Sequence, residues 1–70
     1  MEIIETFMSD EFYMIPEENL IDIIPRINCK IPHEIQILDN WKAHFKSKKI
    51  PFQIRKNGNV LSLWKRREAE

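Results

Sequence analysis

The clearest pattern along the chain is a pair of alternating apolar and polar runs in its last third. Residues 52–56 and 60–66 each alternate with period two, as strands with one buried face do. Between them lies Asn57-Gly58, a dipeptide that favours the positive φ angles of a type I′ turn. The pattern therefore predicts an antiparallel β-hairpin over residues 50–67.

A pattern of helical period precedes the hairpin. From His33 onward, side chains at helical spacing fall on one face, namely Ile35, Leu38, Trp41 or Lys42, and Phe45. An acidic residue near the start and lysines near the end suit the helix dipole. We expect an amphipathic helix from residue 33 that closes at residues 48–51. An alternative keeps residues 34–38 as a strand and starts the helix at Asp39, a good N-cap.

The N-terminal residues are β-prone. Residues 2–8 alternate in part, residues 9–11 form a polar break, and residues 12–15 are again β-prone up to Pro16. The simplest interpretation is an N-terminal hairpin. A continuous helix over residues 1–8 is the alternative, and the β-branched and aromatic content disfavours it.

Residues 16–31 leave two interpretations open. Pro16 and two glutamates resemble a helix start, and Leu20, Ile23, Ile24 and Ile27 have helical spacing until Pro25 interrupts it. The alternative is a short buried strand over residues 20–24, followed by a connector or strand over residues 26–31. Residues 18–25 resemble a pattern in the small β-domain of GINS replication-complex subunits. The proline-leucine-tryptophan stretch that follows in those domains is missing here, so no function is carried over.

Length and element order define the expected fold. Seventy residues make one domain, residues 1–70, in which residues 67–70 are expected to fray. A helix followed by an antiparallel hairpin gives an α+β fold, with an amphipathic helix packed on an antiparallel sheet that ends in the C-terminal β-hairpin. The core of so short a chain is small, so a homo-oligomer or docking on a partner is compatible with it.

The net charge of zero conceals an uneven distribution. Residues 1–40 hold nine acids and two bases (2 − 9 = −7), whereas residues 41–70 hold nine bases and two acids (9 − 2 = +7). If the halves occupy different sides of the fold, two faces of opposite sign result. If the halves pack together, they neutralise each other. The sequence leaves both outcomes open.

No reaction is indicated by the residue types. The chain has one cysteine, one glycine and two histidines eleven positions apart, which excludes an internal disulfide and gives no metal-ligand spacing or phosphate-binding glycine loop. We therefore expect no enzyme, no cofactor and no metal. No apolar run approaches the ~20 residues of a membrane span. That absence, the lone thiol and the acidic start predict a cytoplasmic protein that does not associate with membranes.

The candidate working surface is the outward side of the hairpin. Alternation predicts that Phe52, Ile54, Leu61 and Leu63 face the core and that Gln53, Arg55, Ser62, Trp64 and Arg66 face outward. Tryptophan and arginine are the residues most enriched at the centres of interfaces. Three lysines, Lys46, Lys48 and Lys49, border this surface if the helix end lies beside the hairpin. In the plainer alternative, Trp64 covers an edge of the core or packs against its own arginines.

Two functions are compatible with such a surface. The first is a small non-catalytic module that binds another protein, an adaptor or inhibitor of the kind found among phage and mobile-element accessory regulators. The zero net charge favours this function, because dedicated nucleic-acid binders carry a basic excess. The second is nucleic-acid binding through the basic C-terminal half, in which Trp64 stacks on a nucleobase and the arginines beside it hold phosphates.

Overall fold

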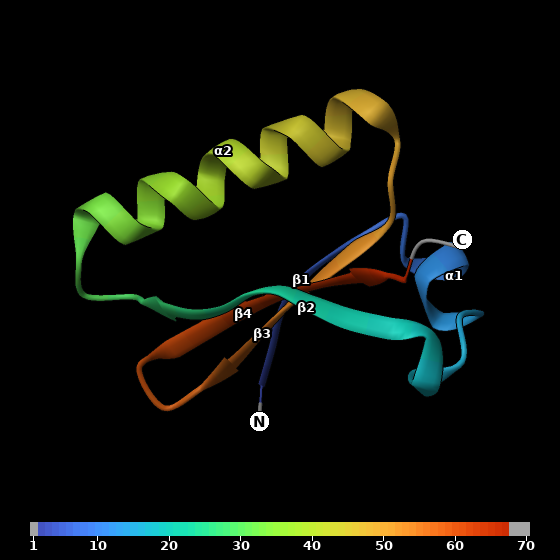
Figure 1. Cartoon of the computed structure of the whole chain (residues 1–70), viewed down its shortest axis with the longest axis horizontal. Helices are drawn as coiled ribbons and strands as arrows, with labels where there is room; N and C mark the ends of the chain where they lie inside the picture. The colour runs from blue at the N-terminus through green and yellow to red at the C-terminus, as the bar shows by residue number, and fades with distance from the viewer. Residues whose placement is uncertain (1, 68–70) are drawn as a thin grey trace.

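The computed structural model describes residues 2–67, which fold into a four-stranded antiparallel sheet with one long helix on one face (Figure 1). The elements in chain order are β1 (Glu2–Phe7), α1 (Ser9–Tyr13), the 3₁₀ turn η1 (Glu17–Asn19), β2 (Leu20–Asn28), α2 (Pro32–Lys48), β3 (Phe52–Asn57) and β4 (Val60–Arg66). The predicted α+β class, with a helix packed on an antiparallel sheet that ends in a C-terminal hairpin, is confirmed.

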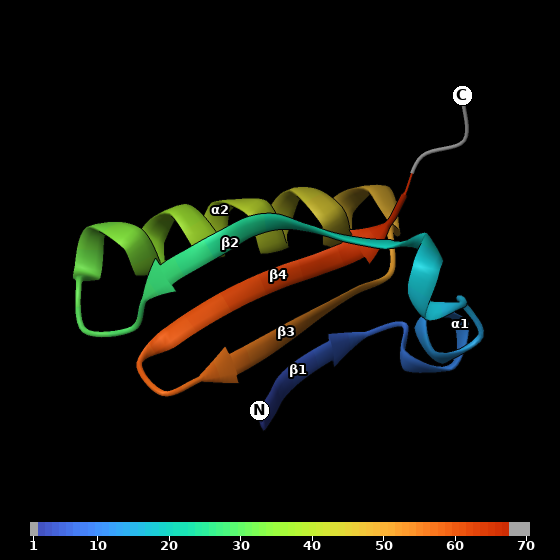
Figure 2. The same ribbon diagram turned by 60° about the horizontal axis from the view of Figure 1, so that its bottom comes forward.

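The C-terminal hairpin lies at the centre of the sheet. The strand order is β1-β3-β4-β2, so β3 and β4 are flanked on both sides by strands from the N-terminal part of the chain (Figure 2). In the hairpin, Phe52 pairs with Lys65, Ile54 with Leu63 and Asn57 with Val60. The most reliable sequence pattern therefore forms the interior of the sheet.

The hairpin turn differs from the prediction by one residue. Asn57 and Val60 are the last paired residues, so the loop consists of Gly58 and Asn59 rather than Asn57 and Gly58. Gly58 has a φ of 64°, whereas Asn59 does not have a positive φ. This pattern of signs belongs to a type II′ turn, in which glycine takes the first loop position.

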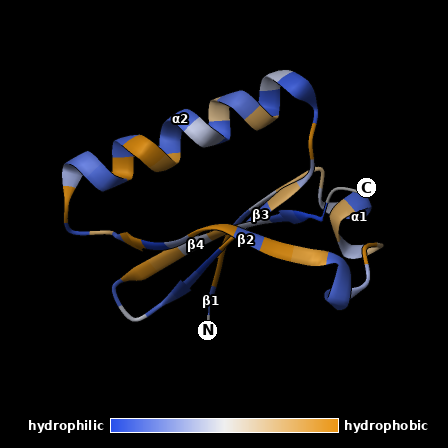
Figure 3. Ribbon diagram, in the orientation of Figure 1, coloured by the Kyte–Doolittle hydropathy of each residue, from blue (hydrophilic) through white to orange (hydrophobic). Residues whose placement is uncertain are grey.

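The long helix α2 covers one face of the sheet and encloses the core. It begins with Pro32 in the first turn, where proline is tolerated, and ends at Lys48, followed by the capping residue Lys49 with a left-handed φ of 56°. The alternative of a strand over residues 34–38 is wrong. The core cluster consists of Ile27, Leu38, Phe45, Phe52, Ile54, Leu61 and Leu63. Figure 3 shows the corresponding distribution, with apolar stretches in the strands and alternating apolar and polar segments along α2.

The predicted N-terminal hairpin is wrong in its second half. β1 forms as expected, but the chain then turns at Met8, whose φ is 54°, into the short helix α1. Asp10 and Glu11 occupy the first turn of α1, where acidic side chains suit the positive end of the helix dipole. The side chain of Phe12 is buried. Residues 12–15 therefore cover the sheet instead of adding a strand to it.

Residues 20–28 are a strand, so of the two interpretations left open the helix is wrong and the strand is right in type, although it is longer than residues 20–24 and is buried only at Leu20 and Ile27. Pro25 does not end this strand. It lies within an irregular stretch of β2, because the pairing with β4 shifts between Asp22 and Ile24 and again between Ile24 and Ile27. β2 is an edge strand, and proline is tolerated at edges and bulges because no ladder hydrogen bond from its nitrogen is needed there.

In the sheet, strands from the acidic half of the chain flank the two strands from the basic half. Ion pairs join the two halves directly. Glu5 contacts Lys42 (3.0 Å) and Lys46 (3.3 Å), and Glu17 contacts Arg55 (3.3 Å). The structure thus corresponds to the second of the two outcomes left open, in which the halves pack together and neutralise part of each other's charge.

At its C-terminal end the described chain is tied to the start of β2. The backbone N–H of Arg67 donates to the carbonyl of Asn19 at 2.6 Å. The rest of the segment expected to fray, residues 68–70, lies outside the described residues. Within residues 2–67, no helix has the length and apolar character that crossing a membrane requires.

Candidate functional site on the sheet face opposite α2

The sheet face that points away from α2, called the outer face below, carries the residues that the sequence singled out. In β3 and β4, Gln53 pairs with Trp64 and Arg55 with Ser62, and these residues alternate with those of the core. From β1, Thr6 pairs with Gln53 and Ile3 with Arg55, so both lie on the same face. The predicted assignment of Gln53, Arg55, Ser62, Trp64 and Arg66 to one face is therefore correct.

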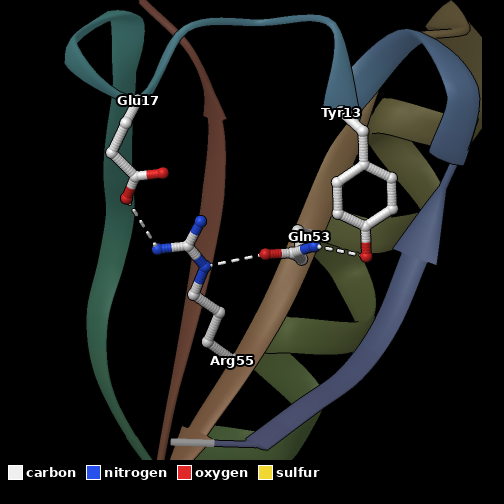
Figure 4. Close-up of polar contacts among 4 residues, drawn as sticks. All are labelled: Tyr13, Glu17, Gln53 and Arg55. Carbon is white, nitrogen blue, oxygen red and sulfur yellow. Dashed lines mark hydrogen bonds and ion pairs between the residues drawn. The ribbon is translucent and has the colours of Figure 1, made fainter.

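Gln53 is the buried centre of a polar network on this face (Figure 4). Only 1% of its surface is exposed. Its Nε2 donates to the Tyr13 hydroxyl at 3.1 Å and to Thr6 Oγ1 at 3.3 Å. Its Oε1 accepts a hydrogen bond from Arg55 Nε at 2.7 Å. The network joins β3 to β1 and to α1, so Gln53 supports the outer face rather than presenting a free amide.

Arg55 is held on three sides. Its Nη1 lies 3.3 Å from Glu17 Oε1, and its guanidinium carbon lies 4.6 Å from the centroid of the Trp64 ring. Such a stacked cation gains from the ring quadrupole, and Arg55 also contacts Gln53. The side chain is only 11% exposed. Arg55 therefore connects Glu17, beside the start of β2, to the centre of the sheet.

Trp64 is half-buried and packs against one of the hairpin arginines, as the plainer of the two alternatives expected. Arg55 stacks against its ring. Its Nε1 is buried and has no hydrogen-bond partner among the described residues.

Two recesses open on the outer face beside this network. One has a volume of about 250 Å³ and is lined by Ile3, Phe12, Tyr13, Ile15, Glu17, Leu20, Gln53 and Arg55. The other has a volume of about 300 Å³ and is lined by Glu11, Met14, Ile15, Pro16, Asn19 and Arg66. Ile15 contributes to both recesses. The segment between β1 and β2 therefore shapes the surface that the hairpin was expected to present.

Two apolar side chains of this segment are strongly exposed. Met14 is 82% exposed and Tyr13 is 62% exposed, although the hydroxyl of Tyr13 is tied to Gln53. Sequence reasoning missed both residues because it assigned residues 12–15 to a strand. The acidic pair Asp10-Glu11 was the available signal, since acids are typical of a first helical turn.

The three predicted lysines do not share the outer face. Lys46 contacts Glu5, whose partner in the register is the core residue Ile54, so this lysine lies on the α2 side of the sheet. Lys48 and Lys49 close the same helix and are exposed. The structure thus brings Gln53, Arg55 and Trp64 together, places Arg66 at the second recess, and separates all four from Lys46.

Among the described residues, Glu5 is the group whose pKa is shifted for a clear reason. Partial burial of the carboxylate acts to raise its pKa, but the hydrogen bonds and charges of Lys42 and Lys46 outweigh that effect. The net result is a pKa below the ordinary value. This carboxylate lies on the α2 side and fastens β1 to the helix.

The described residues contain no group of three or more His, Cys, Asp or Glu side chains that could hold a metal ion. Cys29 is a free thiol that is partly buried against the core. On the outer face, the Gln53 amide and the Arg55 guanidinium are engaged with neighbouring side chains, and the Glu17 carboxylate is exposed.

Comparison with protein-family models, with curated proteins and with solved structures finds no matching family, protein or structure.

Proposed function

We propose that this chain is a small non-catalytic module that binds another protein through its outer face. The observation that carries the proposal is the exposure of Met14 and Tyr13 beside two recesses. Large apolar side chains that are exposed next to concave, polar-rimmed surface are typical of interaction sites. Adaptor and inhibitor roles both fit such a surface.

The arrangement beneath these side chains supports the proposal. The network of Gln53, Arg55 and Glu17 braces the segment that carries Tyr13 and Met14 against the sheet. A braced surface loses little conformational entropy when a partner docks, which favours affinity. In this proposal Tyr13, Met14 and Arg66 contact the partner, whereas Gln53 and Arg55 position the contact residues.

The test uses Met14 and Arg66, two exposed residues that line the second recess. Met14→Glu and Arg66→Glu each place a negative charge at the second recess. Tagged wild-type protein and both variants are used for affinity capture from nuclease-treated extract of the cells that make the protein. We expect one captured protein to be lost with both variants. The purified candidate is then titrated against wild type, with at least a tenfold loss of affinity expected for each variant.

Lys30→Glu is the matched control. It makes the same charge change as Arg66→Glu on an exposed residue between β2 and α2, outside both recesses. Circular dichroism and the unfolding midpoint must be the same for all four proteins. A capture profile that is identical for wild type, Met14→Glu and Arg66→Glu would rule out the outer face as the binding surface.

Nucleic-acid binding is the second candidate, and one observation favours it. The C-terminal end of α2, with Lys48 and Lys49, leads directly into the start of β3, which pairs with the end of β4. Cationic residues from both segments are therefore grouped at one end of the molecule. Ion pairs with Glu5 and Glu17 reduce the charge available on Lys42, Lys46 and Arg55, and this weighs against the candidate.

Salt dependence separates the two candidates. If about four phosphates are neutralised, affinity for a single-stranded oligonucleotide should fall about 50-fold between roughly 50 and 200 mM salt. Fluorescence anisotropy measures this, with Lys48→Glu, Lys49→Glu expected to weaken binding further. The absence of oligonucleotide binding at the lower salt concentration would remove this candidate.

A further inference from the structure

The outward flank of α2 carries a row of side chains that the core does not use. Counting along the helix, Glu34, Ile37, Trp41, His44 and Lys48 follow one another at intervals of three, four, three and four residues. This spacing places them in one stripe, called the α2 seam below. The core-facing residues Leu38 and Phe45 lie on the neighbouring stripe and are buried.

The α2 seam contains a partly exposed tryptophan, Trp41, that packs against two neighbouring rings and lines a depression. Trp41 is 38% exposed, and its ring lies 5.5 Å from that of Phe45, which belongs to the core. The His44 ring meets it edge-on at 6.0 Å. Ile37, Asn40, Trp41 and His44 line an open depression of about 340 Å³. Figure 1 shows α2 as the outermost layer on its side of the sheet, with no other element over it.

The two ends of the seam carry opposite charges at equal distances from its centre. Glu34 lies seven residues before Trp41, and Lys48 lies seven residues after it. Neither forms an ion pair within the described part of the chain. A second helix that runs antiparallel, with Trp41 at the two-fold axis, places Glu34 opposite Lys48 at both ends and Ile37 beside His44. The seam is therefore complementary to itself.

We propose that two copies of this chain associate through antiparallel contact of their α2 seams. A two-fold contact of this kind is the commonest symmetry of homo-oligomers, because one patch serves both partners. Trp41 and Ile37 provide the apolar centre, and the two Glu34–Lys48 pairs fix the antiparallel orientation. A single helix pair buries less than the roughly 1,200 Å² of a standard interface, so the dimer is weak and concentration-dependent.

Sedimentation velocity on the full chain, from about 10 µM to about 1 mM, measures the association. Wild type should shift from monomer to dimer within this range. Trp41→Glu places two like charges at the axis and should keep the chain monomeric. Ile37→Lys changes a side chain outside the core cluster and should weaken the dimer as well. It replaces Trp41→Glu as the test variant if Trp41→Glu impairs folding.

Charge reversal tests the orientation. Glu34→Lys alone and Lys48→Glu alone each create like-charged pairs at both ends of the seam and should each weaken dimerisation about tenfold. An equimolar mixture of the two single variants restores both attractive pairs in a mixed dimer. The double variant Glu34→Lys, Lys48→Glu restores them within a homodimer.

The double variant also distinguishes dimerisation from the other role of Glu34 and Lys48, which is to stabilise α2 through its helix dipole. Glu34 and Lys48 suit the dipole of α2, so reversing both destabilises the helix more than reversing either one. Dimerisation should nevertheless recover in the double variant, while its unfolding midpoint falls below those of the single variants. A wild type that stays monomeric up to 1 mM would overturn the proposal. So would a dimer that Trp41→Glu and Ile37→Lys leave intact, because it would use another surface.

Discussion

At the scale of single residues, Gln53 determines how the outer face is built. It is the only buried polar residue among those described. Its Nε2 donates to Thr6 of β1 and to Tyr13 of α1, and its Oε1 accepts from Arg55 of its own strand. Sequence reasoning placed it on the correct face but treated it as exposed. Alternation predicts which face a side chain occupies, but it cannot reveal that a distant segment covers that face.

Replacing Gln53 should lower the free energy of unfolding, because its hydrogen-bond partners lose their contacts. Gln53→Leu keeps the volume but leaves Arg55 Nε and the Tyr13 hydroxyl without their partner. We expect a loss of ~1–3 kcal/mol in the free energy of unfolding, measured by urea denaturation. Tyr13→Phe, which removes one bond at an exposed residue, is the comparison and should cost less than ~1 kcal/mol. Equal losses for the two variants would show that Gln53 is not the centre of the network.

Glu5 gives the fold a specific sensitivity to acid. Because its pKa in the folded state lies below the ordinary value of ~4.3, its contribution is complete above that value and is lost as the pH falls through the lowered pKa. We expect Glu5→Gln to cost ~0.5–1 kcal/mol at pH 7 and to lose less stability than wild type between about pH 5 and pH 3. Unfolding curves over this range measure both effects.

The matched control for Glu5 is Glu2→Gln. Glu2 lies on the same strand, is exposed, and forms no ion pair among the described residues. The stability of Glu2→Gln should change with pH in parallel with that of wild type, because this variant keeps the contacts of Glu5 with Lys42 and Lys46. Parallel profiles for wild type and Glu5→Gln would contradict the assignment of the acid sensitivity to the Lys42 and Lys46 contacts.

At the scale of elements, α2 and the hairpin were predictable from sequence and the segment from Met8 to Asn28 was not. α2 and the hairpin combine a clear period with local signals, namely lysines at the helix end and a glycine turn. Residues 9–13 form a helix too short for its period to be recognised. Residues 20–28 have apolar spacing that suits helix and strand alike, and the position of Pro25 in an edge strand depends on the sheet around it.

The hairpin turn permits a prediction about backbone strain alone. A Cβ added at Gly58 meets no atom within 4 Å, but the φ of 64° is unfavourable for any L side chain. Gly58→Ala should therefore destabilise the protein by ~1–2 kcal/mol through the backbone conformation. Asn59→Ala is the control. Asn59 makes its contact through the backbone carbonyl, which accepts from the Cys29 N–H at 2.9 Å and is kept in the variant, so this substitution should cost less stability than Gly58→Ala. Thermal unfolding compares them. A neutral Gly58→Ala would mean that the turn can adopt another conformation.

At the scale of the whole molecule, both faces of the central sheet are covered at one end. Phe52, Gln53 and Ile54 are consecutive and all buried, which requires cover on both faces because successive side chains in a strand point to opposite sides. α2 covers one face and α1 with residues 14–19 covers part of the other. The sequence predicted one of these layers, and the second layer determines where the candidate site lies.

This layering predicts an order of local stability. Backbone amides in β3 and β4 lie between two neighbouring strands, whereas β1 and β2 each have one free edge. Native-state hydrogen exchange should therefore be slowest in β3 and β4 and faster by at least tenfold along the irregular stretch of β2 between Asp22 and Ile27. Protection in β2 equal to that of β4 would contradict this order.

The strand order also has a consequence for synthesis of the chain. β1 and β2 are made first, yet each pairs only with a strand of the hairpin formed by residues 52–66. On the ribosome, neither early strand can find its partner until that hairpin has left the exit tunnel. Both strands therefore remain without a partner until residues 52–66 are available, so formation of the sheet depends on its last two strands.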